Sequence, residues 1–511
     1  MTTGTISPGG PDCGAVYAIT DEEWAATPAS VRHALTDLWD KNQRLVEQLG
    51  LTSRNSSKPP SADPPSAPPR EAKPPTGRHA GGQPGHPGHT RELVPEEQVK
   101  ALIPVRPPAC RQCGHAFPAD ATDPAPRRHQ VAELPKVVVE VTEYQLHTLT
   151  CPHCGACTAA ALPAGVPPGL LGPRALALVA TCTGQYHLSK RATATILEDC
   201  FGLAVSDATI CAAEQTVSAA LATPVAEVAD VVRRAAVKHI DETGWRQQRD
   251  PDPEPAPEEE AEEPSPPPTP ASRAQLPKAW LWIVVTTLAT LFCIRRSRGR
   301  VVVKHLLGEQ PVGVIISDRW SAYNWLGVLI RQLCWAHLQR EFTKISARAG
   351  QAGQLGRALL DHTHHLFALW HRYRDGTLTW GAFQQHVTPV REAIGALLRT
   401  GAVLPDAPTT ATTCANLLKW EEALWTFTRV PGVEPTNNAA ERGIRQGVLF
   451  RHVSFGTQSS AGSRFVERVM TAVATCKQQH RNVLDYLTAA VEASQHGQTV
   501  PSLLLTPPTS R

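Results

Sequence analysis

Between Ser30 and Leu49 the apolar side chains recur at alternating steps of four and three residues, which is the pattern of a coiled-coil helix. Asn42 occupies the one gap, and a single asparagine at such a core position fixes register and favours dimers. We therefore predict a coiled-coil helix over residues 20–53 and a chain that is at least dimeric. The alternative is an amphipathic helix that packs on its own domain. The apolar positions are Val31, Leu35, Leu38, Leu45 and Leu49.

Helical periodicity returns in residues 166–234. Residues 188–213 predict one helix, a turn at Gly202 and a second helix capped by Ser206, which resembles a helix-turn-helix unit. The second helix offers no arginine or lysine to a DNA base, whereas Lys190 and Arg191 lie on the first. We predict a DNA-binding region with these two cations as contacts; the alternative is a purely structural helical hairpin.

Short apolar segments farther along the chain predict the strands of a sheet. Val237–Ile240 ends in Asp241, and Val312–Ser317 runs directly into Asp318, so two buried strands are each expected to end in an aspartate. Between them, residues 280–294 predict one long strand or two short paired strands. This run is shorter than the roughly 20 residues that a membrane span needs, so no membrane segment is expected.

A third acid follows in a predicted helix. The segment after Thr436 places Glu441 one turn beyond a Thr/Asn capping run, on a helix able to pack across the sheet. Carboxylates held at a sheet edge suit Mg²⁺, which prefers oxygen ligands and keeps positions open for phosphate and water. Taken singly, Asp241 and Asp318 also fit turn or cap residues, and Glu441 also fits a solvated helix face.

Two Cys-x-x-Cys pairs are separated by 37 residues. Such knuckles hold Zn²⁺ tetrahedrally, because the two-residue spacing lets both thiolates face one ion. An alternating segment, residues 136–149, predicts one or two strands between them, so we predict a zinc-binding ribbon over 94–165. Cys157 leaves the choice of the fourth ligand open, and unliganded cysteines are the alternative. The predicted ligands are Cys110, Cys113, Cys151 and Cys154.

Composition changes the expected partners and compartment. The 511 residues are too many for one hydrophobic core, and the 46 prolines mark linkers such as the Pro/Gly-rich stretch 54–93. Residues 250–272 form an expected surface loop with eight acids and no base; since the net charge is +3, the remaining chain carries +11, which suits a polyanion. Thirteen cysteines in this length, with no charged and apolar leader, indicate a reducing, cytoplasmic setting.

Several motifs occur together and in order: NSSKPPS, GGQPGHPGHTREL, the two cysteine pairs, HIDETGW, SDRWSAYNWL, CWAHLQREF, TNNAAERGIR and FGTQSSAGS. In these stretches the chain closely resembles the insertion-sequence-66 family of transposases, from the N-terminal helix to about residue 490. The resemblance implies a DDE-type transposase: a multidomain α+β/α/β chain with a ribonuclease-H-like core over 235–490. In that core Asp241, Asp318 and Glu441 would bind Mg²⁺ or Mn²⁺.

The same resemblance gives a place to Cys334 and His337, whose Cys-x-x-His spacing looks like a signature shared by several DDE lineages, beside a helical insertion over about 340–425. A zinc-ligand pair and a structural contact near the active site are both open interpretations. Arg442 and Arg445 share the helix expected for Glu441 and would neutralise DNA phosphates, with solvated surface positions as the alternative. Residues 491–511 are expected to form a flexible tail.

The implied function is a transposase that binds the ends of an insertion sequence and catalyses two-metal DNA strand cleavage and strand transfer. DNA and further copies of the chain are the expected partners, with accessory proteins of the same element as an additional class. Structural Zn²⁺ and catalytic Mg²⁺ are the implied cofactors. Two alternatives stay open: an inactive or domesticated DNA-binding derivative, and a nuclease of the same fold that does not join strands.

Overall fold

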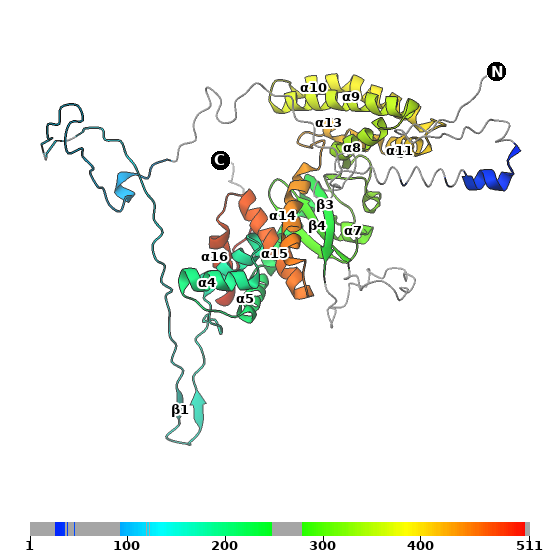
Figure 1. Ribbon diagram of the computed structural model, residues 1–511. Coiled ribbons are helices and arrows are strands. Elements are labelled where there is room, and N and C mark those ends of the chain that lie inside the picture. The colour runs from blue at the N-terminus through cyan, green and yellow to red at the C-terminus, as the bar shows by residue number, and fades with distance from the viewer. Residues whose placement is uncertain are drawn as a thin grey trace. The chain divides into compact units, whose positions relative to one another are not determined.

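The computed structural model in Figure 1 describes residues 26–35, 38, 45, 92–118, 120–121, 123–247 and 278–505. These residues belong to two compact units, one formed by residues 66–139 and the other by the rest of the chain. The smaller unit contains the first cysteine pair and a short 3₁₀ helix, η2 (Glu96–Gln98). The larger unit contains the sheet, the long helices and the acids.

The larger unit is built around a five-stranded mixed sheet with the order β5-β4-β3-β6-β7. Strands β3, β4 and β5 pair antiparallel, whereas β6 runs parallel to β3, and β7 runs parallel to β6. The predicted pair of strands over residues 280–294 is confirmed as β4 and β5. The strands are β3 (Val237–Arg246), β4 (Lys278–Val285), β5 (Thr290–Arg295), β6 (Val314–Ser317) and β7 (Arg331–Leu333).

Helix α14 (Asn438–Ser454) packs across β3 and β4, where two glycines let it approach the sheet closely. A Cβ at Gly443 would collide with the side chain of Ile283, and one at Gly447 with Leu281. Since a helix normally lies about 10 Å from the sheet it covers, these glycines decide how far the first turn of α14 stands from the strands. That first turn carries Glu441.

Helix α15 (Ser460–Gln478) closes the free edge of the sheet at β5. Residues four positions apart on a helix are separated by about 6 Å, and residues two positions apart on a strand by nearly 7 Å. Polar side chains at every fourth position of α15 can therefore bond to the backbone N–H groups at every second position of β5. An exposed edge strand would invite pairing with another chain, and this ladder blocks it. The bonded pairs are Ile294 with Glu467, Phe292 with Thr471 (3.0 Å) and Thr290 with Thr475 (3.2 Å).

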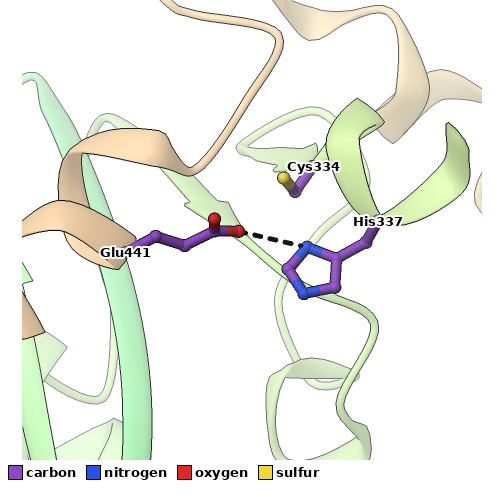
Figure 2. Close-up of side chains that lie close together, drawn as sticks. All are labelled: Cys334, His337 and Glu441. Atoms are coloured by element: carbon purple, nitrogen blue, oxygen red, sulfur yellow. Dashed lines mark ion pairs between the residues drawn. The ribbon is translucent and has the colours of Figure 1, made fainter. Parts of the chain in front are cut away.

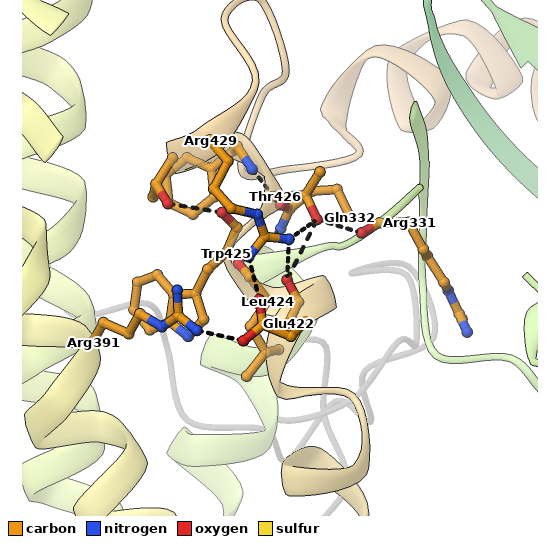
Figure 3. A network of polar contacts seen from close by, with 10 residues as sticks. Arg331, Gln332, Arg391, Glu422, Leu424, Trp425, Thr426 and Arg429 are labelled. Carbon is orange, nitrogen blue, oxygen red and sulfur yellow. Dashed lines mark hydrogen bonds and ion pairs between the residues drawn. The ribbon is translucent and has the colours of Figure 1, made fainter. Parts of the chain in front are cut away.

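The opposite edge strand, β7, is covered by the end of a helical insertion (Figure 3). The Gln332 amide group accepts a hydrogen bond from Phe427 N at 2.8 Å and donates one to Leu424 O at 3.1 Å. Thr426 Oγ1 donates to the Arg331 carbonyl at 2.7 Å. Around these bonds, Glu422 pairs with Arg391 and Arg429, which ties three parts of the insertion together.

The insertion begins and ends a few residues outside the predicted range of about 340–425, because its first helix starts directly after β7. Its hydrophobic core also includes residues of β6 and β7, and it is rich in aromatic rings such as Trp370, Phe383 and Phe427. Its helices are α8 (Trp335–Ser346), α9 (Gly350–Arg374), α10 (Trp380–Ala402), α11 (Pro408–Lys419), α12 (Glu421–Leu424) and α13 (Thr426–Arg429).

The helical region before the sheet has the predicted two helices, with Gly202 in the left-handed conformation (φ 69°) and Ser206 capping the second helix. This region, placed apart from the 235–490 core in the sequence prediction, packs against the sheet. Buried residues such as Ile210 and Val228 belong to the same hydrophobic core as Leu291 and Val469, so region and sheet form one folding unit. The elements are α3 (Pro173–Ala180), a π-helix (Thr181–Gln185), α4 (Lys190–Phe201), α5 (Asp207–Ala220) and α6 (Ala222–Arg234).

Two further expectations need correction. In the segment 136–149 only the last residues form a strand, β1 (Thr148–Thr150), which pairs with β2 (Cys157–Ala159); the rest alternates in polarity but pairs with no strand among the described residues. The expected flexible tail from residue 491 is instead packed up to residue 505. Helix α16 (Val483–Gln495) continues through its start, and Leu503 is fully buried.

The predicted coiled coil, the linker 54–93 and the acidic loop 250–272 lie largely or wholly outside the described residues. In the described part of the predicted coiled coil, residues 29–35 are helical, and apolar side chains of the heptad pattern such as Val31 and Leu38 are exposed. The coiled coil therefore stays a prediction. In the described ranges, no helix combines the length and the apolar character that crossing a membrane requires.

Candidate functional site

Three neighbouring strands, β3, β6 and β7, bring chemically active residues to the end of the sheet where β6 and β7 terminate. Strands β6 and β7 are parallel, with Ser317 opposite Leu333, so the residues that follow them, Asp318 and Cys334, leave the sheet side by side. The parallel register of β3 and β6 pairs His239 with Ile316. Extending this register by two residues puts Asp241 level with Asp318.

The sequence predicted that Asp241 ends its strand, but the strand continues beyond it. Strand β3 continues to Arg246 because β4 pairs with it along its whole length, from His239 opposite Val285 to Arg246 opposite Lys278. Local propensity predicted an end, since Asp, Glu and Gly are poor strand residues, but the antiparallel partner overrides it. What ends beside Asp241 is the neighbouring strand β6, and this leaves the carboxylate open toward Asp318.

Successive residues of β3 face opposite sides of the sheet. Asp241 pairs with Ile283, whose side chain lies against α14 at Gly443, so Asp241 faces the helix that carries Glu441. Glu242 faces the other side, where its carboxylate pairs with Arg298 (Oε1 to Nη2, 2.7 Å) and accepts a hydrogen bond from the hydroxyl of Tyr323. The two adjacent acids therefore have separate surroundings.

Asp318 is held by its backbone. Its Oδ1 accepts a hydrogen bond from Trp320 N at 2.9 Å, and its carbonyl accepts one from Arg331 Nη2 at 2.8 Å. Arg331 is 1% exposed and also donates to Ser317 Oγ and to the carbonyl of Tyr323. Burial lowers the pKa of Arg331 to about 10, which leaves it protonated at neutral pH. The sequence analysis missed this residue, because only its distant partners distinguish it from a surface arginine.

Asn437, the N-cap of α14, connects this helix to the row of strand ends. Its Nδ2 donates to the Ile240 carbonyl at 2.7 Å, and its backbone N–H donates to Cys334 Sγ at 3.1 Å. The residue is fully buried, so both bonds are shielded from water. Asn437 therefore fixes the start of α14, and with it Glu441, against the residue that precedes Asp241. The Thr/Asn run predicted a helix start here, but this local pattern did not indicate the bond to β3.

Glu441 lies beside Cys334 and His337 (Figure 2). Its Oε1 is 3.5 Å from His337 Nδ1 and 3.9 Å from Arg340 Nη2. Among the described residues, Cys334, His337 and Glu441 form the group of potential metal ligands whose donor atoms all lie within 4.8 Å of one another; Asp241 and Asp318 are not part of it. Burial, Arg340 and Arg319 lower the pKa of His337 to about 3, and burial raises the pKa of Cys334 to about 11.

The three predicted acids nevertheless share one electrostatic environment. The pKa of Asp241 is raised well above its usual range, first by burial and then by the charges of Glu242, Asp318 and Glu441; a hydrogen bond from Glu242 N opposes this. Burial and Asp318 likewise raise the pKa of Glu242. Buried carboxylates that repel one another are the surroundings that a divalent cation would stabilise, so these residues fit such an ion.

The two cysteine pairs form the same turn twice. In the first, Cys110 N bonds to His115 O and Gly114 N to Cys110 O, with Gly114 left-handed (φ 74°). The second repeats this from Cys151 N to Ala156 O, with Gly155 at φ 72°. Backbone amides of the turn lower the pKa of Cys110 and of Cys151, which favours the thiolates that bind zinc. The two turns belong to different units.

The predicted DNA-contacting cations differ in their surroundings. Lys190 forms an ion pair with Glu214, which is 7% exposed, and Arg191 lies 3.5 Å from Asp207 at the start of the next helix. Both pairs join α4 to α5 and stabilise the hairpin. Arg442 and Arg445 are exposed on α14, within one turn of Glu441.

A mixed sheet flanked by helices, with partly buried acids where strand β6 ends, defines an α+β protein with a carboxylate-lined site. The sequence identifies the family: residues 168–257 and 267–464, more than half of the chain, match the family described as Transposase IS66 family. The chain belongs to this family, and DNA is therefore the partner class that its membership implies. Residues 17–92 match a family of unknown function.

A relative from Sinorhizobium fredii, named Uncharacterized protein y4qI, is 26% identical over 247 residues. The match covers 43% of this chain and 44% of that protein, so the chain spans less than half the length of this relative. Its name assigns no activity, and the functional argument therefore depends on the family and on the site.

Proposed function

We propose that this protein is a DDE-type DNA transposase that binds the ends of an insertion sequence and catalyses strand cleavage and strand transfer with a ribonuclease-H-like core. The observation that supports the proposal is the register that puts Asp241 level with Asp318, on the face covered by the helix of Glu441, with the charges of both acids raising the pKa of Asp241. The mixed sheet with helices on its faces supports the same assignment.

Asp241, Asp318 and Glu441 would hold two Mg²⁺ or Mn²⁺ ions. When bound, such ions activate water or a 3′-hydroxyl and stabilise the leaving oxygen of an in-line displacement at phosphorus. The protein's own part is to position the ligands: Arg331 holds the backbone of Asp318, and Asn437 holds α14 against β3. The exposed Arg442 and Arg445 are proposed to contact backbone phosphates next to the site, and Lys190 and Arg191 to contact DNA from α4.

Magnesium should stabilise the folded protein through Asp241. Because the folded-state pKa of this acid is raised, the ion-free protein loses stability as pH rises above the unfolded pKa of about 3.9. At neutral pH Asp241→Asn should therefore melt at a higher temperature than the wild type without metal. Mg²⁺ at about a hundredfold excess over its Kd should stabilise the wild type by about 2.7 kcal/mol and the variant much less. Calorimetry with and without EDTA measures both; equal gains would exclude Asp241 as a ligand.

A nuclease of the same fold is the main competing function, since it would use the same acids. A transposase must also join a freed 3′ end to a target. The two are separated by incubating the protein with labelled element ends and target DNA, with either a 3′-hydroxyl or a 3′-deoxy terminus. Joined product that depends on the hydroxyl supports the transposase, whereas cleavage without joining under all conditions supports the nuclease. Binding without either reaction would indicate an inactive, domesticated derivative.

We also propose one structural Zn²⁺ bound by Cys110, Cys113, Cys151 and Cys154, supported by the identical turns around the two cysteine pairs. Native mass spectrometry should then detect the ion in the wild type, and Cys113→Ser or Cys154→Ser should each lose it. Cys157→Ser is the matched control, because its thiol lies on β2 beside Thr150 and outside both turns. Loss of zinc in the control together with retention in Cys154→Ser would assign the fourth ligand to Cys157.

We propose that the protein forms a homo-oligomer, which the exposed apolar residues of the N-terminal heptad pattern support. We also propose that it is cytoplasmic and works with accessory proteins of its element. Removing residues 1–53 should lower the mass measured by light scattering to that of a monomer. The double variant Leu38→Lys/Leu45→Lys should do the same, because each charge would lie in the seam. A mass unchanged in both proteins would reject the coiled coil as the oligomerisation element.

A further inference from the structure

Cys334 and His337 are brought together by the start of helix α8. Cys334 is the N-cap and His337 the third helical residue, and side chains at these two positions meet on one side of a helix start, as they do in a capping box. The His337 N–H bonds to the Cys334 carbonyl at 3.1 Å. The Cys-x-x-His spacing therefore presents a sulfur and an imidazole toward the same space, and α14 brings Glu441 to that space from the other side.

The distances within this group suit a metal ion. In a tetrahedral zinc site with arms of about 2.0–2.2 Å to nitrogen and oxygen, two such ligand atoms lie about 3.4 Å apart. His337 Nδ1 and Glu441 Oε1 are 3.5 Å apart, and Cys334 Sγ is within 4.8 Å of both. Both His337 Nδ1 and Glu441 Oε1 are buried and make no hydrogen bond within the described residues. Buried polar atoms of this kind normally have a partner, which is an ordered water or an ion where the protein supplies none.

The chemistry of the donors selects the ion. A sulfur, an imidazole nitrogen and one carboxylate oxygen suit Zn²⁺, whereas the ligands of Mg²⁺ are almost exclusively oxygen atoms. The Asn437 N–H that points at Cys334 Sγ, 3.1 Å away, would stabilise a thiolate as the amides of a zinc knuckle do. Three protein ligands leave the fourth position to water, which can enter past the Glu441 side chain, 32% exposed.

We propose that Cys334, His337 and Glu441 bind one Zn²⁺, separate from the cysteine knuckles, and that this site shares Glu441 with the magnesium centre. A carboxylate held by zinc beside His337 is unavailable to complete the set with Asp241 and Asp318. Zinc at this site is therefore inhibitory, and magnesium activity requires its release. The inhibitory consequence rests on the proposed transposase function, whereas the metal site itself does not.

The site is tested on the full chain with Co²⁺, which binds zinc sites and gives thiolate-dependent absorption. The number of Co²⁺ ions bound per chain should be one lower in Cys334→Ser and in His337→Gln than in the wild type. Cys414→Ser is the matched control, because Cys414 is equally buried but lies in α11, away from the site. An unchanged cobalt number in His337→Gln, folded as judged by circular dichroism, would overturn the proposal.

The shared ligand is tested by titrating Zn²⁺ into the strand-joining reaction at fixed Mg²⁺. Half-inhibition should need at least tenfold more Zn²⁺ for Cys334→Ser than for the wild type and for Cys414→Ser. Equal inhibition of all three would overturn the sharing of Glu441. If no protein joins DNA under any condition, the proposed function fails, while the cobalt number still decides whether the metal site exists.

Discussion

Asp241→Asn, Asp318→Asn and Glu441→Gln are each expected to lower the rates of strand cleavage and joining by about a thousandfold or more. Each change keeps the size of the side chain but removes a charged oxygen ligand from a site whose electrostatic stabilisation carries most of the rate. Binding of labelled element ends, measured by gel shift at matched salt, should stay near the wild-type affinity. In the proposed mechanism the acids serve the reaction, whereas surface cations bind the DNA phosphates.

Two other acids serve as controls for this experiment. Glu309 is 69% exposed and pairs with Lys304 at the surface, so Glu309→Gln should leave both rates and stability unchanged. Glu242 is adjacent to Asp241 but faces Arg298 and Tyr323 on the other side of the sheet. Glu242→Gln should therefore lower thermal stability while most activity survives. An inactive Glu242→Gln protein together with an active Asp241→Asn protein would show that Glu242, and not Asp241, is the metal ligand.

Arg331→Met should destabilise the protein by about 3 kcal/mol and also slow the reaction. Methionine fills a similar volume but leaves the carbonyls of Asp318 and Tyr323 and the side chain of Asn324 without their donor in a buried place. Urea unfolding at neutral pH measures the stability. Arg319→Met provides a comparison, because that arginine is 32% exposed and pairs with Glu341. Equal losses in the free energy of unfolding of the two variants would show that Arg331 contributes no more to stability than Arg319 does.

The parts of the site that the sequence could predict are those in which a local pattern carries the information. Asp318 follows a short apolar strand, and Glu441 follows a capping run, so their placement at a strand end and in the first turn of a helix is confirmed. The two cysteine turns are local as well. Asp241 was misplaced within its strand because the length of β3 depends on pairing with β4, thirty or more residues away.

The residues that the sequence analysis missed act over long distances. Arg331 and Asn437 are ordinary in their own segments, and only the packing of β7 under Asp318 and of α14 over β3 makes them support the acids. The same holds for the domain division. The amphipathic pattern of α5 predicts a buried face, but it cannot say that the face packs with α15 rather than within its own domain.

The claim that Asp241 is a metal ligand in a DNA-joining enzyme is tested most directly by changing the ligand and the ion together. Cysteine in place of Asp241 should bind Mg²⁺ poorly and Mn²⁺ better, because Mn²⁺ tolerates a softer ligand. We expect the ratio of joining rates in Mn²⁺ and Mg²⁺ to rise at least tenfold in Asp241→Cys relative to the wild type. Joining by Asp241→Cys in Mg²⁺ at the wild-type rate would contradict the account.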